Sequence, residues 1–137
     1  MLKVVLKRAT FFCQIMKRIL TIAAISGMIS VMLGAFGAHG LKKIISPEML
    51  EVYKTGVQYQ FYHTFALLAV GILMHFSESK ALKWSANLFM TGIILFSGSL
   101  YALSVSDIKI LGAITPIGGV AFIAGWVLLA VHLAKTK

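Results

Sequence analysis

The residues most capable of chemistry in this sequence are polar side chains set in long apolar segments. His63 follows Gln58, Tyr59 and Tyr62 where one such segment begins. An imidazole titrates near neutral pH, so inside an apolar segment it can carry protons, bind a ligand or join segments by hydrogen bonds. Together with residues of other segments, these side chains form a candidate polar cluster: His39, Gln58, Tyr59, Tyr62, His63, Ser97, Tyr101 and Thr115.

The environment of His63 has two interpretations. Tyr59 precedes it by one helical turn and is expected on the same face, while Thr115, Ser97 or His39 are the candidate partners from other helices. An ionisable side chain within a membrane span, such as that of His63, is by default a candidate for a functional site. The competing interpretation is a neutral imidazole whose hydrogen bonds only fix the helices, because unpaired polar groups are costly in lipid.

The sequence holds no complete catalytic or cofactor-binding constellation. His63 and His75 are twelve residues apart, which turns them by about 120° on a helix and does not suit a pair of stacked haems. A zinc site needs three ligands, and the apolar segments contain no carboxylate or thiolate. Ser97 and Ser99 have no orienting third group for a triad. We therefore expect no enzyme, no metal and no cofactor, and the lone Cys13 has no partner for an intramolecular disulfide.

Composition indicates the elements that position these residues. The chain has 137 residues, of which 59% are hydrophobic and 12% charged, and its mean hydropathy is +0.91. Four intervals of at least 23 residues contain no charge, whereas a bilayer core needs about 20 helical residues. In water, four such helices would lack enough polar surface. The sequence therefore predicts an all-α bundle of four transmembrane helices, at about 19–38, 57–76, 84–103 and 112–133.

The net charge of +9 is distributed around the apolar segments rather than in one patch, which favours a bilayer over nucleic acid as the partner. Four spans place both termini on one side, which then carries nine basic residues against four on the other. The excess predicts that both termini are cytoplasmic. The nine are Lys3, Lys7, Arg8, Lys17, Arg18, Lys80, Lys83, Lys135 and Lys137, and the four are Lys42, Lys43, Lys54 and Lys109.

The basic N-terminal segment, residues 1–18, precedes a transmembrane domain of residues 19–137. It mixes basic and apolar residues and could lie along the membrane surface. Alternatively, translation starts at Met16 rather than Met1. A third alternative is a secretory signal cleaved near Ala38, which the length of the apolar run disfavours.

Small residues mark the predicted packing faces. Gly and Ala let membrane helices approach closely, where hydrophobicity alone cannot drive association. In the first span they recur at alternating spacings of four and three, and the fourth span begins near a glycine pair. The third span is expected to carry Asn87, Thr91, Gly98 and Tyr101 along one stripe. The predicted packing residues are Ala23, Gly27, Ser30, Gly34, Gly37, Gly118 and Gly119.

The connection between the first two spans is predicted to be a short interfacial helix. Ser46 can cap it, Pro47 suits its first position, and Glu48 suits its first turn. An interruption is expected near Thr55 and Gly56. Since chain direction alternates, the end of the first span, the start of the second, the end of the third and the start of the fourth lie on one side, where the polar cluster should form in the outer leaflet.

Four segments, taken in order, resemble a known family. They are GAFGAHGL at 34–41, TGVQYQFYHTFALL at 55–68, LFSGSLY at 95–101 and TPIGGVAFIAGW at 115–126. Over residues 16–137 the chain resembles the YwdK/YgdD-like inner-membrane proteins, domain of unknown function 423. The resemblance implies a four-span protein of the bacterial plasma (inner) membrane. It brings no established activity and no catalytic residues.

Two kinds of function agree with these residues. The sequence favours an accessory or small-ligand- or lipid-binding membrane protein, whose partners are the bilayer and, in one version, a larger complex or further copies. The alternative is a small-solute transporter or channel with His63 as a proton-linked group. Proton-coupled exporters of this size usually rely on a carboxylate inside the membrane, whereas Glu48, Glu51, Glu78 and Asp107 are all expected in loops.

Overall fold

The computed structural model describes residues 2–135, and this part of the chain is entirely helical apart from its connections. Two residues named above lie outside the described residues: Met1, a candidate translation start, and Lys137, one of the basic residues predicted to be cytoplasmic. The elements are α1 (Leu2–His39), the 3-10 turn η1 (Leu41–Lys43), α2 (Pro47–Phe76), α3 (Lys80–Gly92), the π-helical η2 (Ile93–Ser97), α4 (Gly98–Ser106), the 3-10 turn η3 (Lys109–Ala113) and α5 (Thr115–Lys135).

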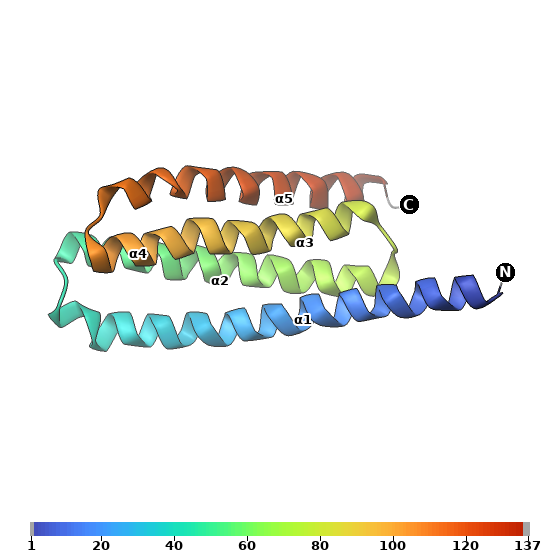
Figure 1. Cartoon of the computed structure of the whole chain (residues 1–137), viewed down its shortest axis with the longest axis horizontal. Coiled ribbons are helices and arrows are strands. Elements are labelled where there is room, and N and C mark those ends of the chain that lie inside the picture. The colour runs from blue at the N-terminus through green and yellow to red at the C-terminus, as the bar shows by residue number, and fades with distance from the viewer. Residues whose placement is uncertain (1, 136–137) are drawn as a thin grey trace.

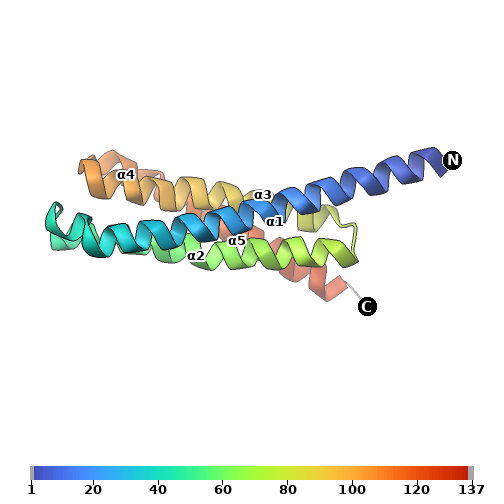
Figure 2. The ribbon, with the colours of Figure 1, turned by 90° about the horizontal axis from the view of Figure 1, so that it is seen from below.

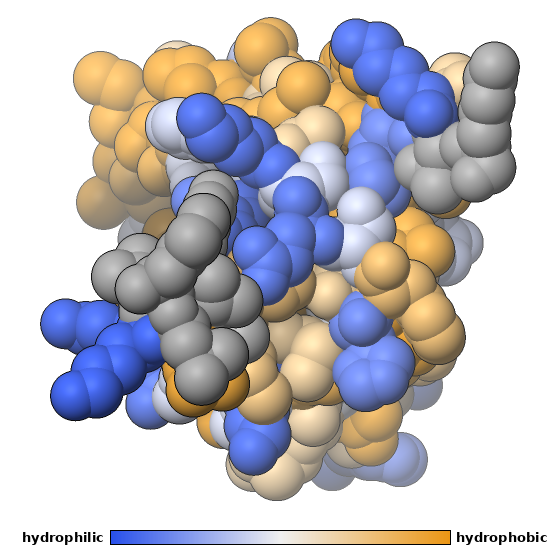
Figure 3. All heavy atoms as spheres, turned by 90° about the vertical axis from the view of Figure 1, so that its right-hand side faces the viewer, coloured by the Kyte–Doolittle hydropathy of each residue, from blue (hydrophilic) through white to orange (hydrophobic). Residues whose placement is uncertain are grey.

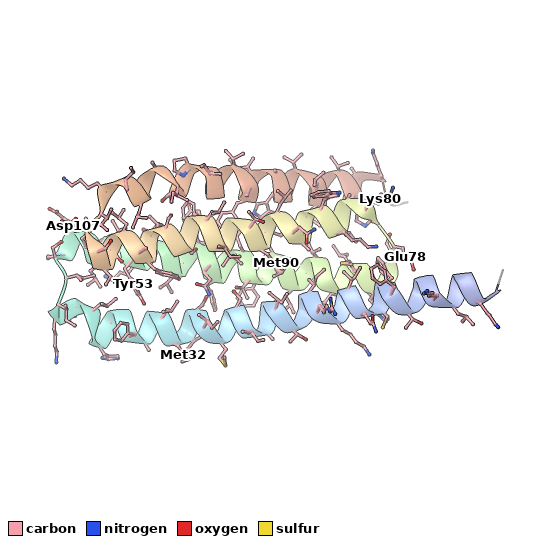
Figure 4. The ribbon with its side chains drawn as sticks, in the orientation of Figure 1. Met32, Tyr53, Glu78, Lys80, Met90 and Asp107 are labelled. Carbon is pink, nitrogen blue, oxygen red and sulfur yellow. The ribbon has the colours of Figure 1, made fainter. Side chains whose placement is uncertain are left out.

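The helices form two antiparallel hairpins that pack side by side (Figures 1 and 2). α1 packs mainly on α2, and α5 packs mainly on α3, while α2 contacts α3, η2 and α4 and so joins the hairpins. Both ends of the chain lie at one end of the bundle (Figure 1). Glu78 and Lys80 are at that end and Asp107 is at the other, so these charged side chains flank the bundle (Figure 4).

α1 is one continuous helix from Leu2 to His39, so residues 2–18 are not a separate element. No proline interrupts this stretch, and its first glycine is Gly27. The N-terminal turns extend past the neighbouring helices (Figure 2). Phe12 is nevertheless buried, and the Lys83 ammonium lies 4.6 Å from the centroid of its ring, a distance at which a cation and an aromatic face attract each other.

α2 begins as predicted, but it does not stop where the sequence suggested. The Ser46 hydroxyl accepts a hydrogen bond from the Met49 amide at 3.2 Å, and Pro47 occupies the first turn. The predicted interruption near Thr55 and Gly56 is wrong, since the helix continues to Phe76. Gly56 instead serves packing, because a Cβ there would come within 2.9 Å of the Tyr101 ring.

The third predicted helix is divided by the π-helical segment η2. A π turn holds one more residue than an α turn, so it rotates the following side chains by about 100° relative to the preceding ones. The predicted stripe from Asn87 to Tyr101 is therefore broken: Asn87 and Thr91 are exposed, whereas Tyr101 is half-buried.

Close packing between α3 and α5 depends on phenylalanine side chains that occupy the space beside glycines. Phe122 of α5 fills the position that a Cβ on Gly92 would need, and Phe89 of α3 lies where a Cβ on Gly125 would come within 2.8 Å. The Ser85 hydroxyl donates to the Gly125 carbonyl at 2.8 Å. Short backbone separation and a buried hydrogen bond are the interactions that hold helices together in lipid.

By length and composition, three helices in the described residues can cross a membrane: 10–43, 80–106 and 109–135. α2 is not among them, because its first half contains Gln58, Gln60 and His63 besides its tyrosines. Hydrophilic side chains gather at the end of the bundle that carries the termini, as the end-on view in Figure 3 shows. An apolar body with a polar end is the distribution expected of a membrane protein.

The adjacent glycines at the start of α5 provide a test of the packing. A Cβ on Gly118 would overlap the backbone of Phe96, whereas a Cβ on Gly119 would lie 3.8 Å from the Phe96 ring. Gly118→Ala should lower the free energy of unfolding by about 1–3 kcal/mol, the usual cost of overpacking. Gly119→Ala is the matched control and should change it by less than about 0.5 kcal/mol. Thermal unfolding of both variants in detergent measures this, and equal stability would contradict the close contact.

Candidate functional site

The His63 side chain projects from α2 toward α5, and aromatic side chains surround it. Its Nε2 accepts a hydrogen bond from the Trp126 indole N–H at 3.2 Å, and its Nδ1 lies 2.8 Å from the Tyr59 carbonyl oxygen. The imidazole is 6% exposed. Since Nε2 is an acceptor, the ring proton belongs on Nδ1, which then donates to the carbonyl. Both ring nitrogens are thus satisfied when the imidazole is neutral.

Aromatic rings also pack around the His63 imidazole. The Phe122 ring stacks on the imidazole with centroids 3.4 Å apart and an interplanar angle of 9°. Tyr59 stacks on Phe96 at 4.6 Å, and the Trp126 ring meets the imidazole edge-on at 6.2 Å. The Phe122 contact is face to face and the Trp126 contact is edge-on, so rings pack against the imidazole from two directions and leave it little room to turn.

These rings line an open pocket of ≈ 430 Å³ between α2 and α5, which we call the aromatic pocket. Tyr59 and Trp126 are 39% and 47% exposed, so the pocket opens on the surface of the bundle. Its lining is aromatic apart from one glycine and one isoleucine. The lining residues are Tyr59, His63, Phe96, Gly119, Phe122, Ile123 and Trp126.

A second polar group occupies a different face of α2, toward α1 and α4. The buried Gln60 amide donates to the Ser26 carbonyl at 3.1 Å, and its oxygen accepts from the Tyr101 hydroxyl at 2.8 Å. Ser26 and Thr64 share a hydrogen bond of 2.7 Å. We call Ser26, Gln60, Thr64 and Tyr101 the Gln60 network. Its members come from the three helices α1, α2 and α4.

The structure divides the predicted polar cluster among several places. Tyr59 and His63 line the aromatic pocket, and Tyr101 belongs to the Gln60 network. Thr115 shares a hydrogen bond of 2.8 Å with Ser99. Ser97 is buried, and its hydroxyl is without a partner in residues 2–135.

The other predicted residues lie on the surface. Gln58 donates to the Tyr62 hydroxyl at 2.7 Å on the exposed side of α2, and His39 is exposed at the end of α1. None of the three proposed partners of His63 from other helices is bonded to it. The hydrogen bond to His63 from another helix comes from Trp126 instead.

The small residues of α1 face α2. A Cβ on Gly27 would touch Thr64 at 3.5 Å, one on Gly34 would touch Val57 at 3.5 Å, and one on Gly37 would press on the Tyr53 ring at 2.7 Å. Ala23 and Ser30 are buried along the same helix. The Tyr53 hydroxyl donates to the Leu33 carbonyl at 3.0 Å, which adds a hydrogen bond to this seam.

Sequence reasoning missed Gln60, Ser26, Phe122 and Trp126. One signal for Trp126 was available: an indole N–H placed a turn or more inside a span needs an acceptor, and His63 is one of few such groups. Gln60 resembled its neighbours Gln58 and Tyr62, and only the helix packing distinguishes the buried glutamine from the exposed one. The described residues contain no group of three or more His, Cys, Asp or Glu able to hold a metal.

The bond between His63 and Trp126 can be measured by a double-mutant cycle. Trp126→Phe removes the indole donor but keeps an aromatic ring, and His63→Phe removes the acceptor but keeps a stacked ring. We expect the two to be coupled by about 0.5–1.5 kcal/mol in the free energy of unfolding, the range found for hydrogen bonds between membrane helices. Reversible unfolding of the wild type, the two single variants and the double variant in mixed micelles gives this coupling energy. If the effects of the two substitutions simply add, the hydrogen bond is not formed.

Comparison with known proteins identifies the family. Residues 33–119 match the family model described as "Protein of unknown function (DUF423)". The UPF0382 membrane protein YwdK of Bacillus subtilis is 48% identical over 121 residues, covering 88% of this chain and 98% of the relative. The UPF0382 membrane protein SAB0533 of Staphylococcus aureus is 47% identical over 120 residues, covering 88% and 98%.

A third relative, the UPF0382 inner membrane protein YgdD of Escherichia coli K12, is 43% identical over 118 residues, covering 86% of this chain and 90% of the relative. No solved structure matches the chain. The resemblance noted in the sequence is confirmed, as is the location in the bacterial inner membrane that it implied. The chain is an integral membrane protein and belongs to the DUF423 (UPF0382) family.

Proposed function

We propose that this chain crosses the membrane four times, with both termini in the cytoplasm, and binds a small amphipathic molecule from the bilayer in its aromatic pocket. α2 is the fourth span in this proposal. Its 30 residues are long enough, and it lies alongside the three apolar helices. Gln60 and His63 are hydrogen-bonded inside the protein, so they do not need water.

The orientation rests on charge. Both ends of the chain lie at one end of the bundle (Figure 1), and eight of the twelve basic residues within 2–135 belong to that end. Lys and Arg are enriched in cytoplasmic connections. The aromatic pocket then lies in the half of the membrane that faces away from the cytoplasm.

The observation that supports ligand binding is the combination of aromatic walls with one unused donor. The Tyr59 hydroxyl has no hydrogen-bond partner in the described residues, and the ring to which it belongs forms part of the wall. A flat ring bearing a carbonyl oxygen could stack among the aromatic side chains and accept from this hydroxyl, while an apolar tail extends into lipid.

The transporter alternative has less support from the same geometry. A proton on His63 Nε2 would point at the Trp126 N–H and break their hydrogen bond, so this pocket favours the neutral imidazole. The four carboxylates of the sequence flank the apolar segments and cannot relay protons through them. With both nitrogens engaged, His63 also has no lone pair free for base catalysis or metal ligation.

The position of α2 can be tested by cysteine labelling in intact cells, because Cys13 is the one native cysteine. In a Cys13→Ser background, Ile44→Cys and Glu78→Cys place thiols at exposed positions on either side of α2. If α2 spans the membrane, an impermeant maleimide should label Ile44→Cys from outside and leave Glu78→Cys unlabelled until the cells are opened.

Wild-type Cys13 is the control for orientation and should be labelled only in opened cells. Labelling of both introduced cysteines from the same side would show that α2 does not cross. Labelling of Cys13 from outside would reverse the proposed orientation.

The pocket can be tested through Trp126 fluorescence. Trp84→Phe leaves Trp126 as the single tryptophan, and a short-chain benzoquinone serves as a flat, electron-poor probe that quenches an indole on contact. We expect saturable quenching in micelles. Gly119→Leu fills the pocket from a position with room for a Cβ and should weaken the apparent affinity at least fivefold.

Gly98→Leu is the matched control, because a Cβ there also meets open space but lies outside the pocket. The benzoquinone should quench its Trp126 fluorescence with the same apparent affinity as in the Trp84→Phe parent protein. Linear, unsaturable quenching in all three proteins, or an unchanged affinity in Gly119→Leu, would contradict ligand binding at the aromatic pocket.

A further inference from the structure

A second open site lies at the other junction of the two hairpins, between α1 and α3. These helices have few direct contacts, and a groove of ≈ 310 Å³ separates them. We call it the basic groove. It shares no residue with the aromatic pocket between α2 and α5, and its lining residues are Ile15, Arg18, Ile19, Ile22, Lys83, Asn87 and Met90.

The basic groove carries two cations and no carboxylate. Arg18 comes from α1 and Lys83 from the first turn of α3, whose helix dipole adds positive potential. The one ion pair found within residues 2–135 joins Lys54 and Glu51, far along the chain from both. The Phe12 ring beside the Lys83 ammonium restrains that side chain. Two cations converging on an apolar groove create a site that an anion would stabilise.

The apolar part of the groove continues deeper into the bundle. On α1 the lining residues follow one another inward from the chain termini as Ile15, Arg18, Ile19 and Ile22, and on α3 as Lys83, Asn87 and Met90. Asn87 is one turn beyond Lys83, about 6 Å deeper at 1.5 Å per residue. Along α3 the order from outside to inside is therefore cationic, then amide, then aliphatic, whereas on α1 Arg18 lies between aliphatic residues.

We propose that the basic groove binds one anionic phospholipid of the cytoplasmic leaflet. The phosphate lies between Arg18 and Lys83, the glycerol ester region reaches Asn87, and an acyl chain covers Ile19, Ile22 and Met90. A free phosphate would leave the aliphatic walls uncovered, and a zwitterionic lipid would bring its own cation to the two basic side chains. The choice of leaflet rests on the orientation given under the proposed function, and cytoplasmic leaflets are rich in anionic lipid.

Native mass spectrometry of the full chain, released from micelles with equal phosphatidylglycerol and phosphatidylcholine, tests this. The wild type should retain one phosphatidylglycerol at least fivefold more often than one phosphatidylcholine. Arg18→Gln with Lys83→Gln should reduce that preference to near parity. Lys42→Gln with Lys43→Gln removes the same charge at the opposite end of the bundle and should keep it.

A third variant separates a lipid site from simple charge attraction. Ile22→Trp keeps both cations but obstructs the aliphatic wall, and it should lose retained phosphatidylglycerol at least threefold while thermal unfolding shows a folded protein. Equal loss in both double variants, or full retention in Ile22→Trp, would overturn the proposal. Gly119→Leu, which fills the aromatic pocket, should leave the preference unchanged, so failure at one site is distinguishable from failure at the other.

Discussion

Helices in a bilayer gain no hydrophobic free energy by associating, because lipid chains are as apolar as leucine side chains. What remains is close packing and hydrogen bonding, and in this protein Phe122 packs against His63, a residue that is hydrogen-bonded between helices. The Phe122 ring fills the space beside Gly92 of α3, and the same ring stacks on His63 of α2 at 3.4 Å. The contact that holds the second hairpin together thus also fixes the imidazole.

The same constraint explains why the most polar helix is the central one. α2 carries Gln60 toward α1 and α4 and His63 toward α5, and each finds its partners on a neighbouring helix. Exposed to lipid, either side chain would be costly. Between the other helices, both side chains are hydrogen-bonded to neighbouring helices.

The all-helical fold, the start of α2 at Ser46 and the membrane location followed from charge spacing, capping chemistry and the resemblance. The arrangement of the polar residues did not. Gln58 and Gln60 are chemically identical, and their burial differs because of helix packing that no local pattern encodes. The π turn of η2 rotates Tyr101 away from the stripe that an unbroken helix would form with Asn87. The hydrogen bond between His63 and Trp126 was not predicted, because the two residues are 63 positions apart in the chain.

The limited contacts of α1 have a consequence for the order of biogenesis. α1 packs mainly on α2, and the Ser26 bonds to Gln60 and Thr64 lie within this hairpin. α1 can therefore complete most of its contacts with other helices while the rest of the chain is still being synthesised. In the proposed four-span topology, the first hairpin would enter the membrane with the Gln60 oxygen and His63 Nε2 unpaired, because their donors, Tyr101 and Trp126, belong to the second hairpin. These two hydrogen bonds would then form last, once the second hairpin is inserted.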